Sequence, residues 1–397
     1  MATIDKSLPN TMTEVEIPGE EEIVEAKEEA VEEISSDGQT EIEMDEEGGA
    51  TINFDPGEVN PEGGEDHDAN LADFLEDNVL DPLASELMEK YTNYKQSRQE
   101  WADSYREGLN LLGFKYVTRT EPFRGASSVT HPVLAEAVTQ FQAQAYKELL
   151  PADGPVRTQI MGDANVAKEE QSKRVKDFMN YQIMDQMKEY EPEFDQMLFY
   201  LPLSGSTFKK VYYDDLLGRA VSKFIPAEDL VVPYSATSLE DAEAVIHVIR
   251  MSPNDLRKQQ INGFYRDIDL GDPPVQEDKL KQKELELEGV TANGTEDVYT
   301  VLEMHVDVDL EGHEDVNPED GEPTGIKLPY IITIDEANEK VLSIRRNYAP
   351  EDPLKKKKDY FVHFKFLPGL GFYGLGLIHM IGGLSRTATV ALRQLLD

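Results

Sequence analysis

Apolar residues recur at helical spacing over the first long patterned stretch of the chain, which begins after residue 70. The spacing predicts one long amphipathic helix, with Asp81 as the N-cap, Pro82 at the first helical position and Gly113 after the end. Arg98 falls in the apolar stripe of this helix, where we expect a snorkelling or paired side chain at the edge of the buried face. The stripe contains Leu83, Leu87, Tyr91, Tyr94, Trp101, Tyr105, Leu109 and Leu112.

Three further helices are predicted before the pattern changes. Thr130 is the expected cap of the first, whose apolar stripe runs from Leu134 to Leu149 and which Pro151 ends. The second spans about residues 165–190, and we expect its methionines and aromatic residues to lie in the core. The third is short, is apolar on one side and stops at Pro202.

Beyond residue 206 the period changes from helical to alternating, which predicts antiparallel strands. In residues 298–310 the even positions are apolar, so Glu303, His305, Asp307 and Asp309 are expected on a solvent-exposed face. Residues 266–296 are polar and predict a linker or excursion. The strands are expected at 207–213, 219–225, 244–250, 298–310, 330–334, 341–346 and 360–366, with a helix at 253–265.

A last helix is predicted from Gly374 onward. No Gly, Asn or Pro ends it before Asp397, so we expect the sequence to be cut off inside this helix. The fold class is therefore α+β, with an arm at 1–70, a mixed domain at 71–373 and the start of a helix at 374–397. The expected apolar face of the helix contains Ile378, Ile381, Leu384, Ala388, Ala391 and Leu395.

The N-terminal segment differs from the rest of the chain in composition. Residues 1–70 hold 23 acidic residues against two lysines, and Phe54 is their one aromatic residue. Such a segment cannot bury enough apolar surface to offset the entropy of ordering it, so we expect it to be disordered. We interpret it as a solvating arm, and the alternative is an acidic tail that mimics DNA charge or binds a basic partner.

Composition also limits the chemistry of the chain. It has no cysteine, which excludes disulfides and thiolate metal sites, and its seven histidines show no zinc spacing, so no metal site is predicted. There is no signal pattern and no apolar run of membrane-spanning length, and we expect a soluble protein that is intracellular at synthesis. The net charge of −41 argues against a tight grip on DNA phosphates, but not against a smooth channel for DNA.

One motif is similar to a nucleotide-binding turn. Gly369, Gly371 and Gly374 match the pattern G-x-G-x-x-G after a predicted strand and before a helix. A dinucleotide fold places this turn at the first strand of a βαβ unit, whereas helices and antiparallel-looking strands precede it in this chain. We therefore interpret these glycines, together with Gly376, as a tight strand-to-helix bend where chain segments approach closely. No catalytic residue and no cofactor is predicted.

Three groups of short motifs occur in order along residues 75–397. EPFRGASS stands at 121–128, and SGSTFKKV at 204–211 is followed by IPAEDL at 225–230, DAEA at 241–244 and MSPNDL at 251–256. FYGLGLI at 372–378 then leads into a helix that carries Arg386 and Arg393. Together these stretches resemble the wing region and the approach to the stem of portal proteins of tailed bacteriophages.

The resemblance implies a virion protein that is not an enzyme, uses no cofactor and does not enter membranes. Portal proteins form rings, usually of twelve subunits, at one capsid vertex, after assembly in the host cytoplasm. Double-stranded DNA passes through the ring without sequence-specific contacts. Terminase, capsid and scaffolding proteins, and tail adaptor proteins are the expected partners. This sequence departs from the family pattern by ending where the first stem helix would start.

The resemblance also makes Arg386 and Arg393 candidates for contact with DNA. They are seven residues apart and so share one helix face, where they are expected to meet phosphates if the helix lines a channel. The alternative is that they pair with acidic residues of a neighbouring subunit. Two other functions stay open: a nucleotide-binding enzyme that uses Gly369, Gly371 and Gly374, and a non-portal virion scaffold or adaptor protein.

Overall fold

The computed structural model describes residues 41–44, 50–53, 67–114, 123–162, 165–214, 217–273, 283, 287, 298–316, 323–369 and 371–397. Its contacts divide the chain into two units, residues 1–66 and 67–397, which we describe separately. In the first unit, β1 (Glu41–Met44) pairs antiparallel with β2 (Ala50–Asn53). These two short strands are the described part of the first unit. The predicted disorder of the arm otherwise concerns residues that lie outside the described ones.

The second unit starts at His67, before the boundary predicted at residue 70. The reason is Asn70, a buried polar residue that caps the short 3-10 helix η1 (Leu71–Asp73). Its side chain accepts a hydrogen bond from the Ile344 amide at 2.9 Å and donates one to the Leu342 carbonyl at 3.3 Å. Residues 67–70 are therefore tied to the sheet and do not belong to the arm.

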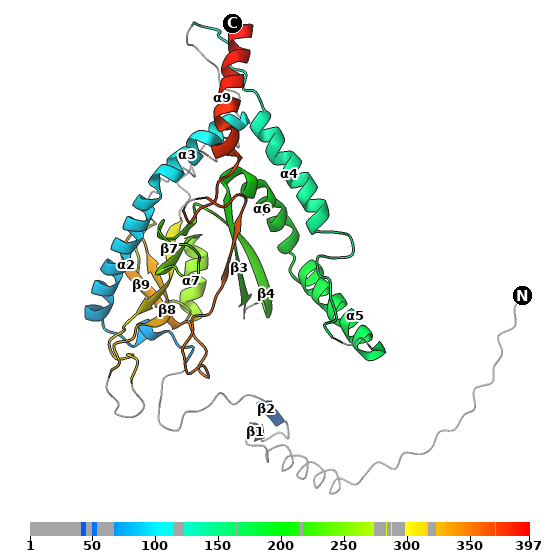
Figure 1. The fold of residues 1–397 in the computed structure, drawn as a ribbon. Helices are drawn as coiled ribbons and strands as arrows, with labels where there is room; N and C mark the ends of the chain where they lie inside the picture. Colours follow the sequence, from blue (N-terminus) through cyan, green and yellow to red (C-terminus); the bar gives the residue numbers. More distant parts are fainter. Residues whose placement is uncertain are drawn as a thin grey trace, which may run out of the picture. The chain divides into compact units, whose positions relative to one another are not determined.

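This unit contains a five-stranded antiparallel sheet with the order β5-β6-β7-β8-β9, which lies beside helix α2 (Asp77–Ser97) (Figure 1). The even positions of β7, such as Leu302 and Met304, face helix α2, as the alternation predicts. Leu80, Leu87 and the rest of the α2 stripe complete this apolar core. The strands are β5 (Leu230–Val231), β6 (Ala244–Met251), β7 (Tyr299–Val308), β8 (Leu328–Asp335) and β9 (Lys340–Arg346).

The predicted long helix is two helices. Helix α2 (Asp77–Ser97) starts before Asp81, which is therefore not its cap, and Pro82 lies inside it. Pro82 is the sixth residue of the helix, past the first turn, so its missing amide removes one backbone hydrogen bond from the helix. The chain leaves helical geometry at Arg98 and continues as α3 (Gln99–Leu109) and the 3-10 helix η2 (Asn110–Leu112). Gly113 follows in the left-handed conformation, as predicted for the end.

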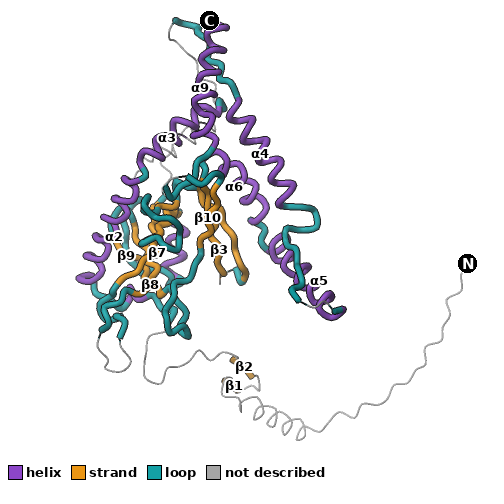
Figure 2. Tube along the Cα trace, in the orientation of Figure 1, coloured by secondary structure: helices purple, strands orange, loops and turns teal. Residues whose placement is uncertain are grey.

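A second antiparallel sheet, with the order β10-β3-β4, packs on the other face of β7 (Figure 2). It consists of β3 (Ser206–Asp214), β4 (Arg219–Pro226) and β10 (Phe361–Lys365), and its β3–β4 hairpin agrees with the prediction. This sheet covers Glu303 and His305, so the prediction that they face solvent is wrong. The alternation of apolar and polar residues predicts which residues share a face of the strand. It does not predict that a second sheet covers the polar face.

The middle helices differ from the prediction in their ends and in their burial. Helix α4 (Val133–Leu149) has Pro132 and not Thr130 at its N-cap. The helix expected at 165–190 is α5 (Val166–Tyr181), which a π-helical turn, η3 (Gln182–Gln186), follows. No residue of α5 is buried, which corrects the expectation of a core helix. Helix α6 (Tyr190–Ser204) includes Pro202 and ends at Gly205, which adopts the left-handed conformation.

Part of the predicted linker at 266–296 is ordered. Helix α7 (Pro253–Ile261) is followed by residues 262–273, in which the Arg266 amide donates to the Leu342 carbonyl at 2.8 Å and Leu270 is buried. Residues 266–273 therefore cover the sheet and are not a linker, because Leu270 and Tyr265 extend the apolar cluster around Leu342. Most of the remaining stretch to residue 296 lies outside the described residues.

Candidate functional site

The four candidate glycines lie where strand β10 turns into the last helix, α9 (Leu377–Leu396). A Cβ atom on Gly374 would lie 2.4 Å from the Gly205 carbonyl oxygen, and one on Gly376 would lie 2.3 Å from the Leu203 carbonyl oxygen. A Cβ on Gly371 would meet the Tyr234 ring at 2.7 Å. For Gly369 the nearest atom, the Tyr373 carbonyl oxygen, would lie at 3.0 Å. The bend therefore packs backbone against backbone, which larger residues do not allow.

The backbone amides of the bend are occupied by groups of the same chain. The Gly374 amide donates to Ser206 Oγ at 2.7 Å and the Leu375 amide to the Leu367 carbonyl at 2.8 Å. The Gly376 amide donates to His379 Nδ1 at 3.1 Å. In a dinucleotide turn these amides bind the ligand phosphates, and the turn follows a parallel strand. All strand pairs of the described residues are antiparallel.

Arg98 anchors the bend to the helix break between α2 and α3. Its guanidinium is buried and donates to the carbonyl oxygens of Ala227, Glu228 and Leu230 and to the Tyr373 hydroxyl. The Tyr373 ring stacks on Trp101, with 4.8 Å between the ring centroids. Arg98 is thus not a snorkelling residue at the edge of a face, as its position in the stripe suggested. It satisfies carbonyl groups that the irregular backbone leaves without partners.

Helix α9 buries a face that shares Ile378 with the predicted one and otherwise differs from it. Ile378, Gly382, Ser385 and Thr389 face the chain. Leu384 is 70% exposed and Leu395 is 84% exposed, although both belong to the predicted apolar face. The reason is the close packing of α9 on α3. A Cβ atom on Gly108 of α3 would lie 2.2 Å from Ile378 Cγ2. Small residues permit this approach, and most of the larger apolar residues are left outside.

Arg386 and Arg393 line one hollow of about 800 Å³ between α3, η2 and α9. Arg393 donates to the Val129 carbonyl at 2.7 Å and to Thr130 Oγ1 at 3.3 Å, so its guanidinium is held against residues 128–130. Arg386 is exposed and makes no ion pair or hydrogen bond with any described residue. Glu107 of α3 also lines this hollow. The two arginines thus share one face, as their spacing predicts.

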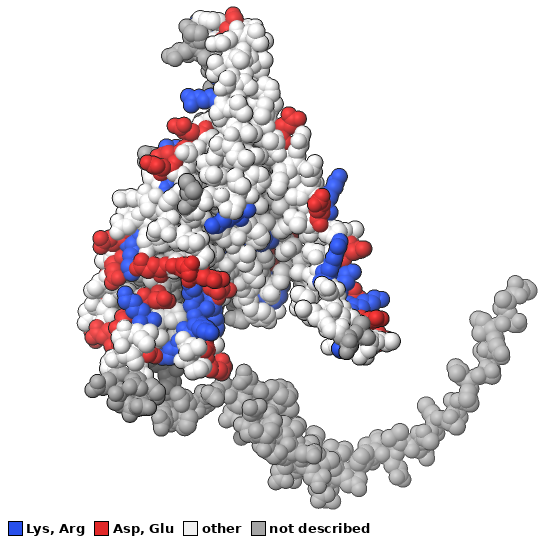
Figure 3. Space-filling view, viewed as in Figure 1, with Lys and Arg blue, Asp and Glu red and all other residues white. Residues whose placement is uncertain are grey.

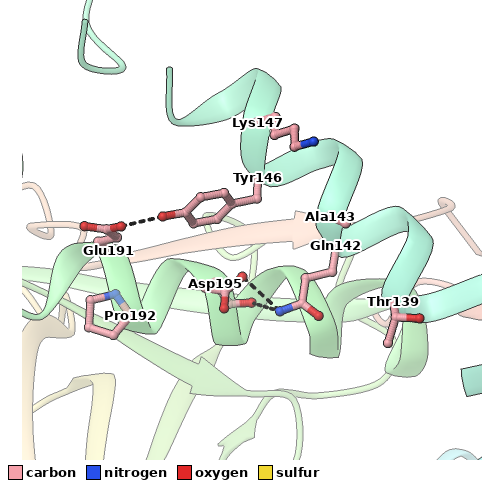
Figure 4. Close-up of a pocket in the computed structure, with 8 residues that line it drawn as sticks. All are labelled: Thr139, Gln142, Ala143, Tyr146, Lys147, Glu191, Pro192 and Asp195. Atoms are coloured by element: carbon pink, nitrogen blue, oxygen red, sulfur yellow. Dashed lines mark hydrogen bonds between the residues drawn. The ribbon is translucent and has the colours of Figure 1, made fainter. Parts of the chain in front are cut away.

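A second hollow, of about 520 Å³, lies between α4 and α6 (Figure 4). Four of its polar residues bond in two pairs across the two helices. Gln142 donates to Asp195 Oδ1 at 2.9 Å, and the Tyr146 hydroxyl donates to Glu191. The Glu191 interaction raises the pKa of Tyr146. Because these groups already have partners in one another, the hollow is a polar seam between helices.

The sequence did not reveal a buried charged cluster between the two sheets. Lys210 Nζ of β3 lies 2.5 Å and 2.6 Å from the two carboxylate oxygens of Glu303 on β7, and His305 Nε2 lies 2.8 Å from one of them. Burial acts to raise the pKa of Glu303, but Lys210 and His305 outweigh it and hold this pKa well below its usual range. The sequence feature that could have indicated this cluster is the presence of charged residues in an otherwise apolar strand.

The comparisons with known proteins identify no family for this chain. No protein-family model and no curated protein sequence matches the chain.

The described residues offer packing surfaces and a hollow lined by two arginines. Among them, no three His, Asp or Glu side chains cluster in a way that could hold a metal ion. None of their helices is both long enough and apolar enough to cross a membrane. The chemistry available at the bend is therefore close packing by glycine, and the chemistry available along α9 is apolar contact and charge from arginine.

Proposed function

We propose that this chain is a subunit of a phage portal, the ring at one capsid vertex through which double-stranded DNA is packaged and ejected. Its partners would be other copies of the chain, terminase, capsid and scaffolding proteins, and tail adaptor proteins. The protein would act in the virion after assembly in the host cytoplasm. The observation that carries the proposal is helix α9, which follows a rigid glycine bend and presents an apolar stripe to solvent.

The stripe consists of Met380, Leu384 and Leu395, which are 53%, 70% and 84% exposed, together with Ala388 and Ala391. These residues lie on one side of the helix at its rotation of about 100° per residue. On the face shown in Figure 3, the surface over α9 is almost free of charged residues. A contiguous apolar stripe of this kind marks a contact surface. A ring of identical copies covers such a stripe on every subunit.

The alternative functions receive less support. A nucleotide-binding enzyme needs free amides at Gly369, Gly371 and Gly374, and the amide of Gly374 is bonded to Ser206. A scaffold or adaptor protein of the virion would use the same apolar stripe for assembly. The formation of a closed ring separates a portal from these proteins, since a scaffold does not need a central channel.

Native mass spectrometry and electron microscopy of the full gene product test the proposal. We expect closed rings near twelve subunits with a central hole. A Leu384→Glu variant should stay small, because it places a charge in the stripe, while an Ile261→Glu variant changes an exposed apolar residue elsewhere and should still form rings. A wild-type protein that stays monomeric or dimeric at high concentration contradicts the proposal, and nucleotide binding at the bend is then the next measurement.

A further inference from the structure

The hollow beside α9 collects hydrogen-bond donors in a strongly acidic protein. His379, Arg386 and Arg393 follow each other at steps of seven residues and line it together. Seven residues are two helical turns, so these side chains form a column along α9 with a rise of about 10 Å per step. Helix α9 contains no acidic residue, although the chain as a whole carries a net charge of −41.

Local contacts orient two members of this column. Arg393 is held by the Val129 carbonyl and Thr130 Oγ1, which restricts its guanidinium before any ligand arrives. His379 Nδ1 accepts the Gly376 amide, so the proton of the neutral ring is on Nε2, which is then a donor. Burial lowers the pKa of His379, which keeps the ring neutral. Preorganised donors of this kind lose little entropy on binding.

One acidic side chain shares the hollow with these donors. Glu107 of α3 lines it and opposes the binding of any anion there. Arg386, in contrast, has no partner among the described residues and is available to a ligand. A carboxylate beside an unpaired arginine lowers the affinity for an anion without abolishing it.

We infer that this hollow binds phosphate groups weakly, with Arg386 as the main ligand and Glu107 as the group that limits affinity. The inference rests on the proposed function, in which DNA has to be contacted and released repeatedly. Guanidinium groups match phosphate oxygens in geometry, and a neutral imidazole adds a donor without adding charge. The phosphate group belongs either to DNA or to a free phosphate in solution, and the experiment distinguishes the two.

The test is binding of a labelled DNA duplex to the full chain at low salt, measured by fluorescence anisotropy. We expect Arg386→Gln to weaken binding about tenfold. Glu107→Gln should tighten it roughly two- to fivefold, because it removes a repulsive charge near the protein surface. The matched control is Arg174→Gln, which removes the same charge from the exposed surface of α5 and should leave affinity unchanged.

Each alternative result has a defined meaning. Displacement of the duplex by millimolar inorganic phosphate supports a site for single phosphate groups, and resistance to displacement supports a site for the DNA backbone. Equal effects of Arg386→Gln and Arg174→Gln would overturn the inference, as would absence of binding or equal affinity for polyglutamate. Ring formation is measured on the same samples, so failure of the portal proposal is seen separately as loss of rings.

Discussion

Helix α2 buries its predicted apolar stripe, whereas helix α9 exposes much of its own. In α2, Leu83, Leu87 and Tyr91 pack on the five-stranded sheet. In α9, Leu384 and Leu395 point to solvent while Gly382 and Ser385 are buried. Both stripes follow the same periodicity, so the difference lies in their partners. A sheet offers a broad apolar surface, whereas α3 contacts α9 closely at Gly108, which packs against Ile378, and this narrow contact leaves most of the α9 stripe uncovered.

The largest expected effect comes from equal truncations of the two stripes. Leu87→Ala should lower the free energy of unfolding by about 2–5 kcal/mol, because it leaves a cavity under α2. Leu384→Ala should change it by less than about 0.5 kcal/mol in the isolated subunit, because the side chain is 70% exposed. Urea unfolding followed by circular dichroism measures both. Similar losses for the two variants would show that the α9 stripe is covered within one chain.

A second test uses glycines at the start and in the middle of α9. Gly376→Ala should destabilise the fold by about 1–3 kcal/mol, because its Cβ would lie 2.3 Å from the Leu203 carbonyl oxygen. Gly383→Ala should stabilise it by about 0.5–1 kcal/mol, because nothing lies within 4 Å of its Cβ and alanine favours the helix. Thermal unfolding measures both changes. Destabilisation by both substitutions would show that α9 packs tightly on all sides.

A third test concerns the face of the five-stranded sheet that α2 does not cover, through the pH dependence of stability. His247 lies on the face of the five-stranded sheet opposite to α2, where burial lowers its pKa to about 3. Between about pH 6.5 and pH 3 the unfolded chain binds a proton that the folded chain does not. Stability is therefore full above pH 6.5 and is lost on acidification, by about 1.4 kcal/mol per pH unit for this residue.

His247→Gln should flatten this pH dependence of stability by that amount. Burial also lowers the pKa of His363 to about 3. His363 therefore contributes a similar loss of stability on acidification, and this loss remains in the His247→Gln variant. Urea unfolding at a series of pH values from 7 to 4.5 gives the slopes. Unchanged slopes in the variant would mean that His247 is protonated in the folded protein.

The smallest expected effect concerns a surface ion pair that ties α2 to β9. Lys340 Nζ lies 2.7 Å from Asp81 Oδ1, and both side chains are about half exposed. Asp81→Asn should lower the free energy of unfolding by less than about 1 kcal/mol, and the difference should vanish at high salt. Denaturation at low and high sodium chloride checks this. A larger, salt-independent loss would show that the pair is effectively buried.

Some features of the candidate site are predictable from the sequence and others are not. Strand positions from 206 onward, the bend at Gly374 and the shared face of Arg386 and Arg393 follow from local spacing. The anchoring of the bend by Arg98 does not, because its partners at Ala227 and Leu230 are far away in the sequence. The burial of Glu303 likewise depends on Lys210 of another sheet. Such pairings arise only after distant segments pack together.

The sequence by itself determined the α+β class, the β-hairpins and the face shared by the α9 arginines. These features depend on hydrophobic period and turn chemistry, which act over a few residues. Tertiary structure alone decided which face of α9 is buried, that α5 stays outside the core, and that Glu303 and His305 on the polar face of β7 are covered. Those outcomes depend on which surfaces pack together. The hydrophobic periodicity of a segment predicts its own apolar face, but it does not predict which other segment packs against that face.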